Sequence, residues 1–172
     1  MISKKNLVLL GMMGVGKTSV GKLLSKKLNL DFFDIDHIIE KENKLKIKEI
    51  FDQKGEEYFR KKEEITSLNY LKKNNCVISL GGGAFVSKNI REKVLLKTES
   101  FWLTTSIKIL KSRLKLNTKR PLLNNIGINN IEKLVKERNE FYKLANHKIE
   151  CEKLTLNEIS NIIIKLNENK KN

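Results

Sequence analysis

The residues with the most specific chemistry form a glycine-rich stretch near the N-terminus, Gly11-Met-Met-Gly-Val-Gly-Lys17-Thr18. It fits the pattern GxxxxGK[ST] and lies between an apolar run typical of a strand and an amphipathic run typical of a helix. Glycines let backbone N–H groups surround phosphate oxygens, and the helix N-terminus adds partial positive charge. Lys17 can then reach the β- and γ-phosphates, and Thr18 can offer its hydroxyl to Mg²⁺. This context favours a nucleotide site over an ordinary glycine-rich turn.

The rest of the chain indicates how the nucleotide is used. Asn43-Lys44 is followed by Leu45-Lys46, so the NKxD guanine-reading motif of GTPases is not matched there. The chain is too short for a motor or helicase core, and its size suits a kinase of small molecules. Within the glycine-rich stretch and the residue after it, the predicted ATP-binding residues are Gly14, Val15, Gly16, Lys17, Thr18 and Ser19.

Two aspartates, Asp34 and Asp36, follow the second apolar run. A spacing of two places both side chains on one face of an extended chain, and at the carboxyl end of a strand that face looks into the cleft. We expect one carboxylate to assist Mg²⁺ and the other to accept a hydrogen bond from the attacking hydroxyl. The alternative for Asp36 is an N-cap of the next helix.

A third apolar run ends in the triplet Gly81-Gly82-Gly83, which would let a ligand approach the backbone closely. The alternative is a flexible turn. Ser79 stands where many P-loop proteins carry a Walker-B aspartate, so we expect the metal to depend on Thr18 and Asp34.

Four arginines, Arg60, Arg113, Arg120 and Arg138, lie outside the predicted core faces of a chain that otherwise prefers lysine. The choice of arginine indicates that a planar, bidentate hydrogen-bond donor is needed at these positions. The alternative for any one of these arginines is a solvated surface charge. Glu63 follows Arg60 at i+3 and could hold its guanidinium. Arg120 precedes a proline inside the polar stretch 115–125, which we interpret as a mobile lid that carries a cation onto the phosphates.

These residues need a parallel α/β sheet to bring them together. Short apolar runs alternate with amphipathic patterns, which predicts a three-layer sandwich around a five-stranded parallel sheet, with ligands at the carboxyl ends of the strands. The predicted strands are Asn6–Leu10, Asp31–Asp34, Cys76–Leu80, Ser100–Leu103 and Lys148–Cys151. The predicted helices are Lys17–Leu28, one from near Asp36, Gly55–Lys72, Ser87–Leu96, Ser106–Leu114, Asn130–Ala145 and Leu156–Leu166. Thr155 and Glu158 form a predicted capping box on the last helix.

Length and composition indicate one domain over residues 1–172, with a polar tail at 167–172. No apolar run is long enough for a membrane span, and no signal peptide is recognisable, so we expect a cytoplasmic protein. The net charge of +15 comes from lysines spread along the whole chain, which argues against specific nucleic-acid binding and favours small anionic substrates. Cys76 and Cys151 are expected to be buried thiols, and neither histidine has metal-binding spacing.

Together these motifs resemble the shikimate kinase family over nearly the whole chain. The P-loop, the Asp34/Asp36 pair, the segment Gly55–Arg60, the glycine triplet, Arg120-Pro-Leu-Leu and Arg138-x-x-x-Tyr142 occur in that family's order and approximate spacing. The resemblance implies phosphorylation of the 3-hydroxyl of shikimate by ATP with Mg²⁺, in chorismate biosynthesis. The alternatives are a kinase of another hydroxy acid such as gluconate, or a nucleotide-binding regulator.

The resemblance also implies roles for matching residues. Lys17 and Thr18 would serve the phosphates and Mg²⁺, with Asp34 near the metal, and Asp36 would orient or deprotonate the acceptor hydroxyl. The predicted shikimate-binding residues are Asp36, Arg60, Gly82 and Arg138, with Phe51 and Phe59 on the apolar side of the ring. Arg120 would act on the transferring phosphoryl group and Arg113 near adenine. Glu152–Thr155 lacks the arginine that some family members place beside adenine. We expect a monomer.

Overall fold

Five parallel strands form the central sheet in the computed structural model, which describes residues 5–115 and 130–168. The strand order is β2-β3-β1-β4-β5. The strands are β1 (Asn6–Leu10), β2 (Asp31–Asp34), β3 (Cys76–Ser79), β4 (Thr98–Thr104) and β5 (His147–Glu150). The predicted five-stranded parallel sheet is therefore confirmed, with strand ends within three residues of those expected.

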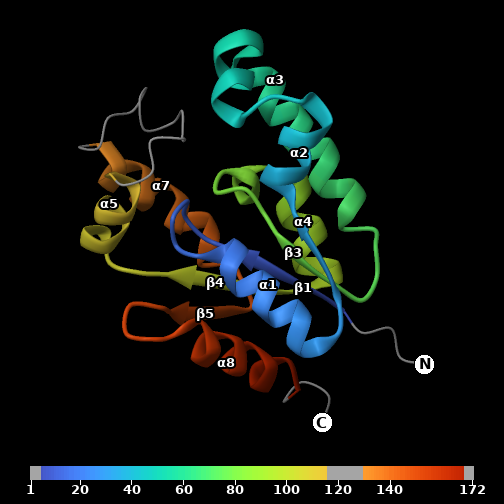
Figure 1. Cartoon of the computed structure of the whole chain (residues 1–172), viewed down its shortest axis with the longest axis vertical. Helices are drawn as coiled ribbons and strands as arrows, with labels where there is room; N and C mark the ends of the chain where they lie inside the picture. Colours follow the sequence, from blue (N-terminus) through green and yellow to red (C-terminus); the bar gives the residue numbers. More distant parts are fainter. Residues whose placement is uncertain (1–4, 116–129, 169–172) are drawn as a thin grey trace.

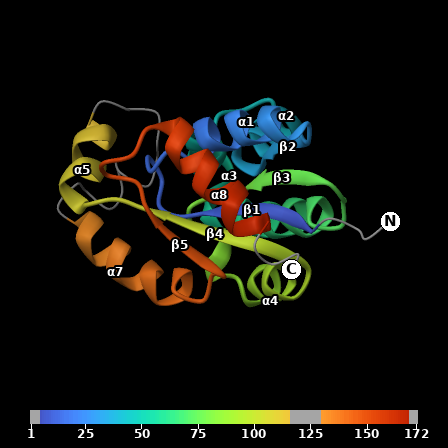
Figure 2. The ribbon, with the colours of Figure 1, turned by 90° about the horizontal axis from the view of Figure 1, so that it is seen from below.

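Helices cover both faces of this sheet, so the molecule has three layers. In Figure 2, α1 and α8 lie on one face, while α4 and α7 lie on the other. Figure 1 shows α2 and α3 extending beyond the sheet. The helices are α1 (Lys17–Leu28), α2 (Ile35–Asn43), α3 (Ile47–Tyr70), α4 (Lys88–Lys97), α5 (Ile107–Lys115), α7 (Ile131–Tyr142) and α8 (Leu156–Glu168), with a short 3₁₀ turn η1 (Ala84–Val86).

Strands β1 and β3 are almost entirely apolar because both faces of the sheet are covered there. Every residue of β1 and β3 is buried, which explains their continuous apolar runs in place of alternation. Cys76 is buried at the start of β3, and Cys151 is buried just after β5. Burial raises the pKa of both thiols, to about 11 for Cys76, so both stay protonated at neutral pH.

Helix α3 differs from the prediction at its N-terminus. It begins at Ile47, not at Gly55, and Gly55 interrupts it with φ of +81° and ψ of 167°. This backbone conformation is accessible to glycine and strained for other residues, so the helix can change direction there. At the other end of the chain, the predicted capping box is confirmed. Thr155 N donates to Glu158 Oε2 at 2.8 Å, and Glu158 N donates to Thr155 Oγ1 at 3.2 Å.

Strand register places the expected functional segments at one edge. Leu9 of β1 pairs with Ser79 of β3, and Ser79 pairs with Asp34 of β2. The P-loop, the glycine triplet and the aspartate pair therefore follow three neighbouring strands and emerge side by side. No helix in the described part of the chain is long and apolar enough to cross a membrane.

Candidate active site

The P-loop joins β1 to α1 through glycines in the left-handed region. Gly14 has φ of +81°, and Gly16, the N-cap of α1, has φ of +109°. These angles turn the backbone toward the space in front of the helix N-terminus. Lys17 Nζ is buried and donates to the carbonyl oxygens of Gly11 at 2.7 Å and Met12 at 3.1 Å. Val15 is buried, whereas Thr18 and Ser19 are exposed at the start of α1.

Thr18 and Asp34 meet where the metal was expected. Thr18 Oγ1 donates to Asp34 Oδ2 at 2.6 Å, and Asp34 Oδ1 accepts from His37 N at 3.3 Å, which makes Asp34 the N-cap of α2. The N-cap alternative for Asp36 is therefore wrong. The extended backbone assumed for the two aspartates is also wrong, because the chain turns from strand to helix at Ile35, but both side chains line the same cavity as expected.

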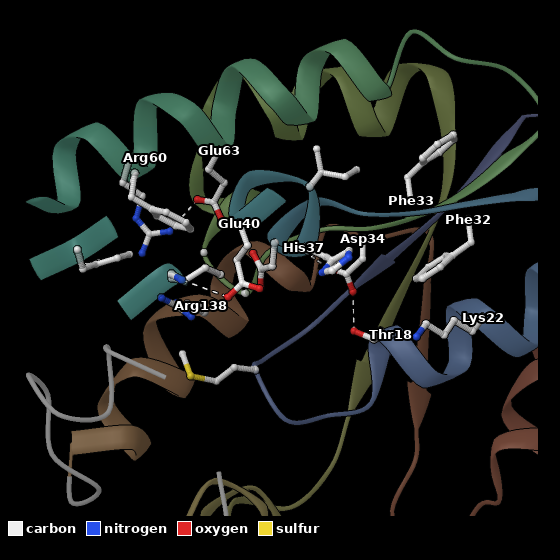
Figure 3. Close-up of a pocket in the computed structure, with 18 residues that line it drawn as sticks. Thr18, Lys22, Phe32, Phe33, Asp34, His37, Glu40, Arg60, Glu63 and Arg138 are labelled. Atoms are coloured by element: carbon white, nitrogen blue, oxygen red, sulfur yellow. Dashed lines mark hydrogen bonds and ion pairs between the residues drawn. The ribbon is translucent and has the colours of Figure 1, made fainter. Parts of the chain in front are cut away.

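Beside this pair lies a cavity of about 530 Å³, within the range of small-molecule sites. Figure 3 shows Arg60 and Glu63 reaching toward it from α3, Arg138 from α7, and Thr18 and Asp34 from the opposite side. Predicted site residues that line it are Thr18, Asp34, Asp36, Arg60, Gly82 and Arg138. The structure thus brings together all four predicted acceptor-binding residues and both predicted metal-binding residues.

The apolar part of the cavity is as expected. Phe51 and Phe59 both line it, and their ring centroids are 4.8 Å apart. Ile47 and Met13 add further apolar surface. The lining of the cavity therefore combines apolar and charged side chains, which suits a ring compound with a carboxylate and hydroxyl groups.

The three positions of the glycine triplet must lack side chains mainly because side chains from other parts of the protein occupy the adjacent space. A Cβ on Gly81 would lie 2.2 Å from Glu63 Oε1 and 2.7 Å from Asp36 Oδ1. A Cβ on Gly83 would lie 2.4 Å from Arg60 Nη1, and one on Gly82 would lie 3.3 Å from Arg138 Nη1. The sequence-based reason, approach of a ligand to the backbone, omitted these contacts. The glycines allow the charged residues to gather around a single backbone segment.

Glu63 is the central buried carboxylate of this group. Its side chain is 4% exposed, and Oε2 accepts a hydrogen bond from Arg60 Nη1 at 2.7 Å, which confirms the predicted i,i+3 pair. Burial raises the pKa of Glu63, the charge of Arg60 opposes that rise, and nearby Asp36 adds to it. Sequence reasoning identified Glu63 only as a partner of Arg60. Its nearness to Asp36 and to the glycine triplet comes from the tertiary structure.

Arg138 is placed differently from the prediction. We expected it outside the core faces, but it is only 5% exposed. Burial lowers its pKa, and the neighbouring charge of Arg60 lowers it further, while Tyr142 and Glu63 oppose the shift. Two guanidinium groups therefore face the same cavity in a partly desolvated setting, where an anionic ligand is attracted strongly.

Arg113 and Arg120 were expected on the nucleotide side. Arg113 Nη1 lies 3.3 Å from the carbonyl oxygens of both Gly14 and Val15, so it tethers α5 to the P-loop. Its contact with adenine remains a prediction. Arg120 lies outside the described residues, as does the predicted lid beyond Lys115. Glu152, after β5, accepts a hydrogen bond from Ser106 Oγ at 3.1 Å.

The oxygen donors near the P-loop fit Mg²⁺. Thr18 and Asp34 offer a hydroxyl and a carboxylate side by side, and Mg²⁺ is commonly held by one or two such protein groups together with phosphate oxygens and water. Among residues 5–115 and 130–168, no group of three or more His, Cys, Asp or Glu side chains could hold a metal on its own. The donor set therefore suits a metal that arrives with a nucleotide.

Comparisons with known proteins agree on one family. The family model for shikimate kinase matches residues 13–167. A shikimate kinase from Sulfurihydrogenibium sp. is 41% identical over 155 residues, covering 90% of this chain and 93% of that protein. A shikimate kinase from Bacillus pumilus is 38% identical over 165 residues, covering 95% of this chain and 89% of that protein. The solved structure of the Acinetobacter baumannii shikimate kinase in complex with shikimate superposes with a TM-score of 0.87 and 28% identity, covering 97% of this chain and 94% of that one.

Proposed function

The chain belongs to the shikimate kinase family and is an ATP-dependent kinase of shikimate, and we propose that the 3-hydroxyl is the phosphorylated group. The products are then shikimate 3-phosphate and ADP. The single observation that supports this assignment is the gathering of Asp36, Arg60, Gly82 and Arg138 at one cavity next to the P-loop helix. The rival acceptors and a purely regulatory role have no comparable support.

The acceptor is held by charge and by shape. Arg60 and Arg138 bind the shikimate carboxylate and ring hydroxyls, because guanidinium groups form paired hydrogen bonds with a carboxylate. The Gly82 backbone adds polar contact, and Phe51 and Phe59 pack against the ring. With the carboxylate held by the two guanidinium groups, the ring presents its reactive hydroxyl to Asp36, which lines the same cavity.

The transfer step depends mainly on position and charge neutralisation. Asp36 accepts a hydrogen bond from the 3-hydroxyl and takes its proton as the oxygen attacks the γ-phosphorus. The P-loop amides, Lys17 and Arg120 stabilise the charge on the transferred group and on the departing ADP. Arg113 acts next to adenine. Thr18 and Asp34 would hold Mg²⁺, which would neutralise phosphate charge.

A coupled ADP-release assay tests the assignment. ATP and Mg²⁺ are supplied with shikimate, quinate, gluconate or a nucleoside monophosphate in parallel. Of the four acceptors, we expect only shikimate to give rapid ADP release. Phosphorus NMR of the product should then locate the new phosphate ester at the 3-position. Equal rates with gluconate, or nucleotide binding without shikimate-dependent turnover, would contradict the proposal.

We further propose that the enzyme works as a monomer in the bacterial cytoplasm, without a nucleic-acid partner. The acceptor-binding residues all come from a single chain, which supports a site that needs no second subunit. Light scattering coupled to gel filtration would show one species of 19.9 kDa if this is right.

A further inference from the structure

The glycine triplet is held in shape by three hydrogen bonds to its carbonyl oxygens. Gly81 O accepts from Ala84 N at 3.1 Å, and Gly83 O accepts from Val86 N at 3.1 Å, so both belong to the local turn around η1. Gly82 O accepts instead from the hydroxyl of Tyr142, which lies 60 residues away on α7. The middle carbonyl is therefore fixed by a side chain from a different element.

Tyr142 is itself held rigidly. It is 1% exposed. Its ring centroid lies 6.4 Å from that of Phe85, in a stacked arrangement, and 5.9 Å from that of Trp102. Burial raises the pKa of Tyr142 above its ordinary value, although the charge of Arg138 and a hydrogen bond with it oppose the shift. The hydroxyl therefore keeps its proton at neutral pH and remains a donor to Gly82.

The position of Tyr142 links two parts of the acceptor site. It lies one helical turn after Arg138 on α7, so the helix that supplies the cation also fixes the glycine triplet. That triplet is in turn the surface against which Asp36, Glu63 and Arg60 rest. Three successive glycines have wide backbone freedom, and a rotation of the Gly82–Gly83 peptide would move the wall of the cavity.

We infer that Tyr142 is a positioning residue for the acceptor site: through Gly82 it holds the glycine triplet against Arg138 and keeps the cavity in its substrate-binding shape. The inference rests on the function proposed above. The hydroxyl of Tyr142 donates to the Gly82 carbonyl oxygen and takes no part in phosphoryl transfer. Its loss should therefore weaken shikimate binding selectively, with little effect on the nucleotide.

The substitution Tyr142→Phe tests this, because it removes the hydroxyl and retains the ring. We expect the KM for shikimate to rise about five- to twentyfold, as for loss of one buried hydrogen bond, while the KM for ATP stays within about twofold. The matched control is Tyr58→Phe, which removes an exposed hydroxyl of α3 that donates to Asn43 Oδ1 at 2.8 Å. Its kinetic constants should equal those of the parent.

The outcomes separate the competing explanations. A purely structural role would lower the midpoint of thermal unfolding and leave both KM values unchanged at 25 °C, which would overturn the inference. Equal rises in both KM values would overturn it as well. If the parent enzyme fails to phosphorylate shikimate, the proposed function fails; if the parent is active and Tyr142→Phe matches it, only the role of Tyr142 fails.

A second variant keeps the test decisive if Tyr142→Phe does not fold. Trp102→Phe retains the Tyr142 hydroxyl but loosens the packing of its ring. We expect a smaller rise in the KM for shikimate, about two- to fivefold, again without a matching rise for ATP. An unchanged KM for shikimate in this folded variant would contradict the inference.

Discussion

Asp36 and Glu63 bring two carboxylates to the same glycine, and Arg60 and Arg138 bring two guanidinium groups to the adjacent ones. Each charge is tolerable near the core because an opposite charge lies close to it, as the 2.7 Å contact between Arg60 and Glu63 illustrates. Asp36 lies in the first turn of α2, two residues after Asp34, and lines the same cavity, so it is the carboxylate we assign to the acceptor hydroxyl.

The first prediction concerns Asp36. Replacing it with asparagine keeps the size of the side chain but removes the carboxylate that accepts the proton. We expect kcat to fall about 100-fold or more, within the range for loss of a general base, while ATP affinity stays within a few-fold. Steady-state kinetics and nucleotide titration measure these quantities. Asp52→Asn, at an exposed position of α3, is the control. Comparable turnover in Asp36→Asn and the parent would remove Asp36 from this role.

The second prediction concerns Arg138. Removing its guanidinium takes away a charge-assisted contact to the carboxylate, a loss of about 2–5 kcal/mol. Arg138→Ala should therefore raise the KM for shikimate roughly 30-fold or more and leave the KM for ATP nearly unchanged. Lys136→Ala removes an exposed cation from the same helix and serves as the control. Equal rises for both substrates would place Arg138 elsewhere in the mechanism.

The candidate acceptor site is built by the ends of three strands and by helices α2, α3 and α7. β1, β3 and β2 are neighbours in the sheet, so the segments that follow them converge at its carboxyl edge. Helices α3 and α7 then bring Arg60, Glu63 and Arg138 to that edge from two directions (Figure 3). The segment after β3 must be narrow because these side chains crowd against it.

The third prediction tests that crowding. A Cβ at Gly83 would lie 2.4 Å from Arg60 Nη1, the end of a flexible side chain, so Gly83→Ala should displace Arg60 without unfolding the protein. We expect the KM for shikimate to rise about tenfold, because a misplaced guanidinium loses part of a charge-assisted hydrogen bond. At Gly82 the contacts of an added Cβ begin at 3.2 Å, so Gly82→Ala should have a milder effect. A larger effect at Gly82 than at Gly83 would contradict this packing argument.

The molecule as a whole carries a net charge of +15, while ATP and shikimate are anions. Its positive field should draw both substrates toward the cleft, and salt screens such fields over about 10 Å at 0.1 M ionic strength. We therefore expect kcat/KM for both substrates to fall several-fold between roughly 10 mM and 300 mM KCl. Initial rates at low substrate concentration measure this. No dependence on salt would show that the lysines act only as solvated surface charges.

Local patterns were sufficient for the sheet, the P-loop and most helices. Apolar runs predicted the strands because strands covered on both faces are rich in apolar residues, and the order of short runs and amphipathic segments predicted the layers. The P-loop was predictable because its function needs glycines and a lysine at fixed spacing. The capping box at Thr155 was predictable for the same reason: its hydrogen bonds join residues only three positions apart.

Which charges are buried, and what they contact, depends on long-range packing. The burial of Arg138, the nearness of Glu63 to Asp36, and the bond from Tyr142 to Gly82 join residues far apart in the chain. No local pattern encodes such contacts, because they depend on how α3 and α7 pack over the end of the sheet. Residue types and their local spacing are enough to predict the chemistry available to this chain, whereas the packing of distant elements selects which residues act on the same substrate.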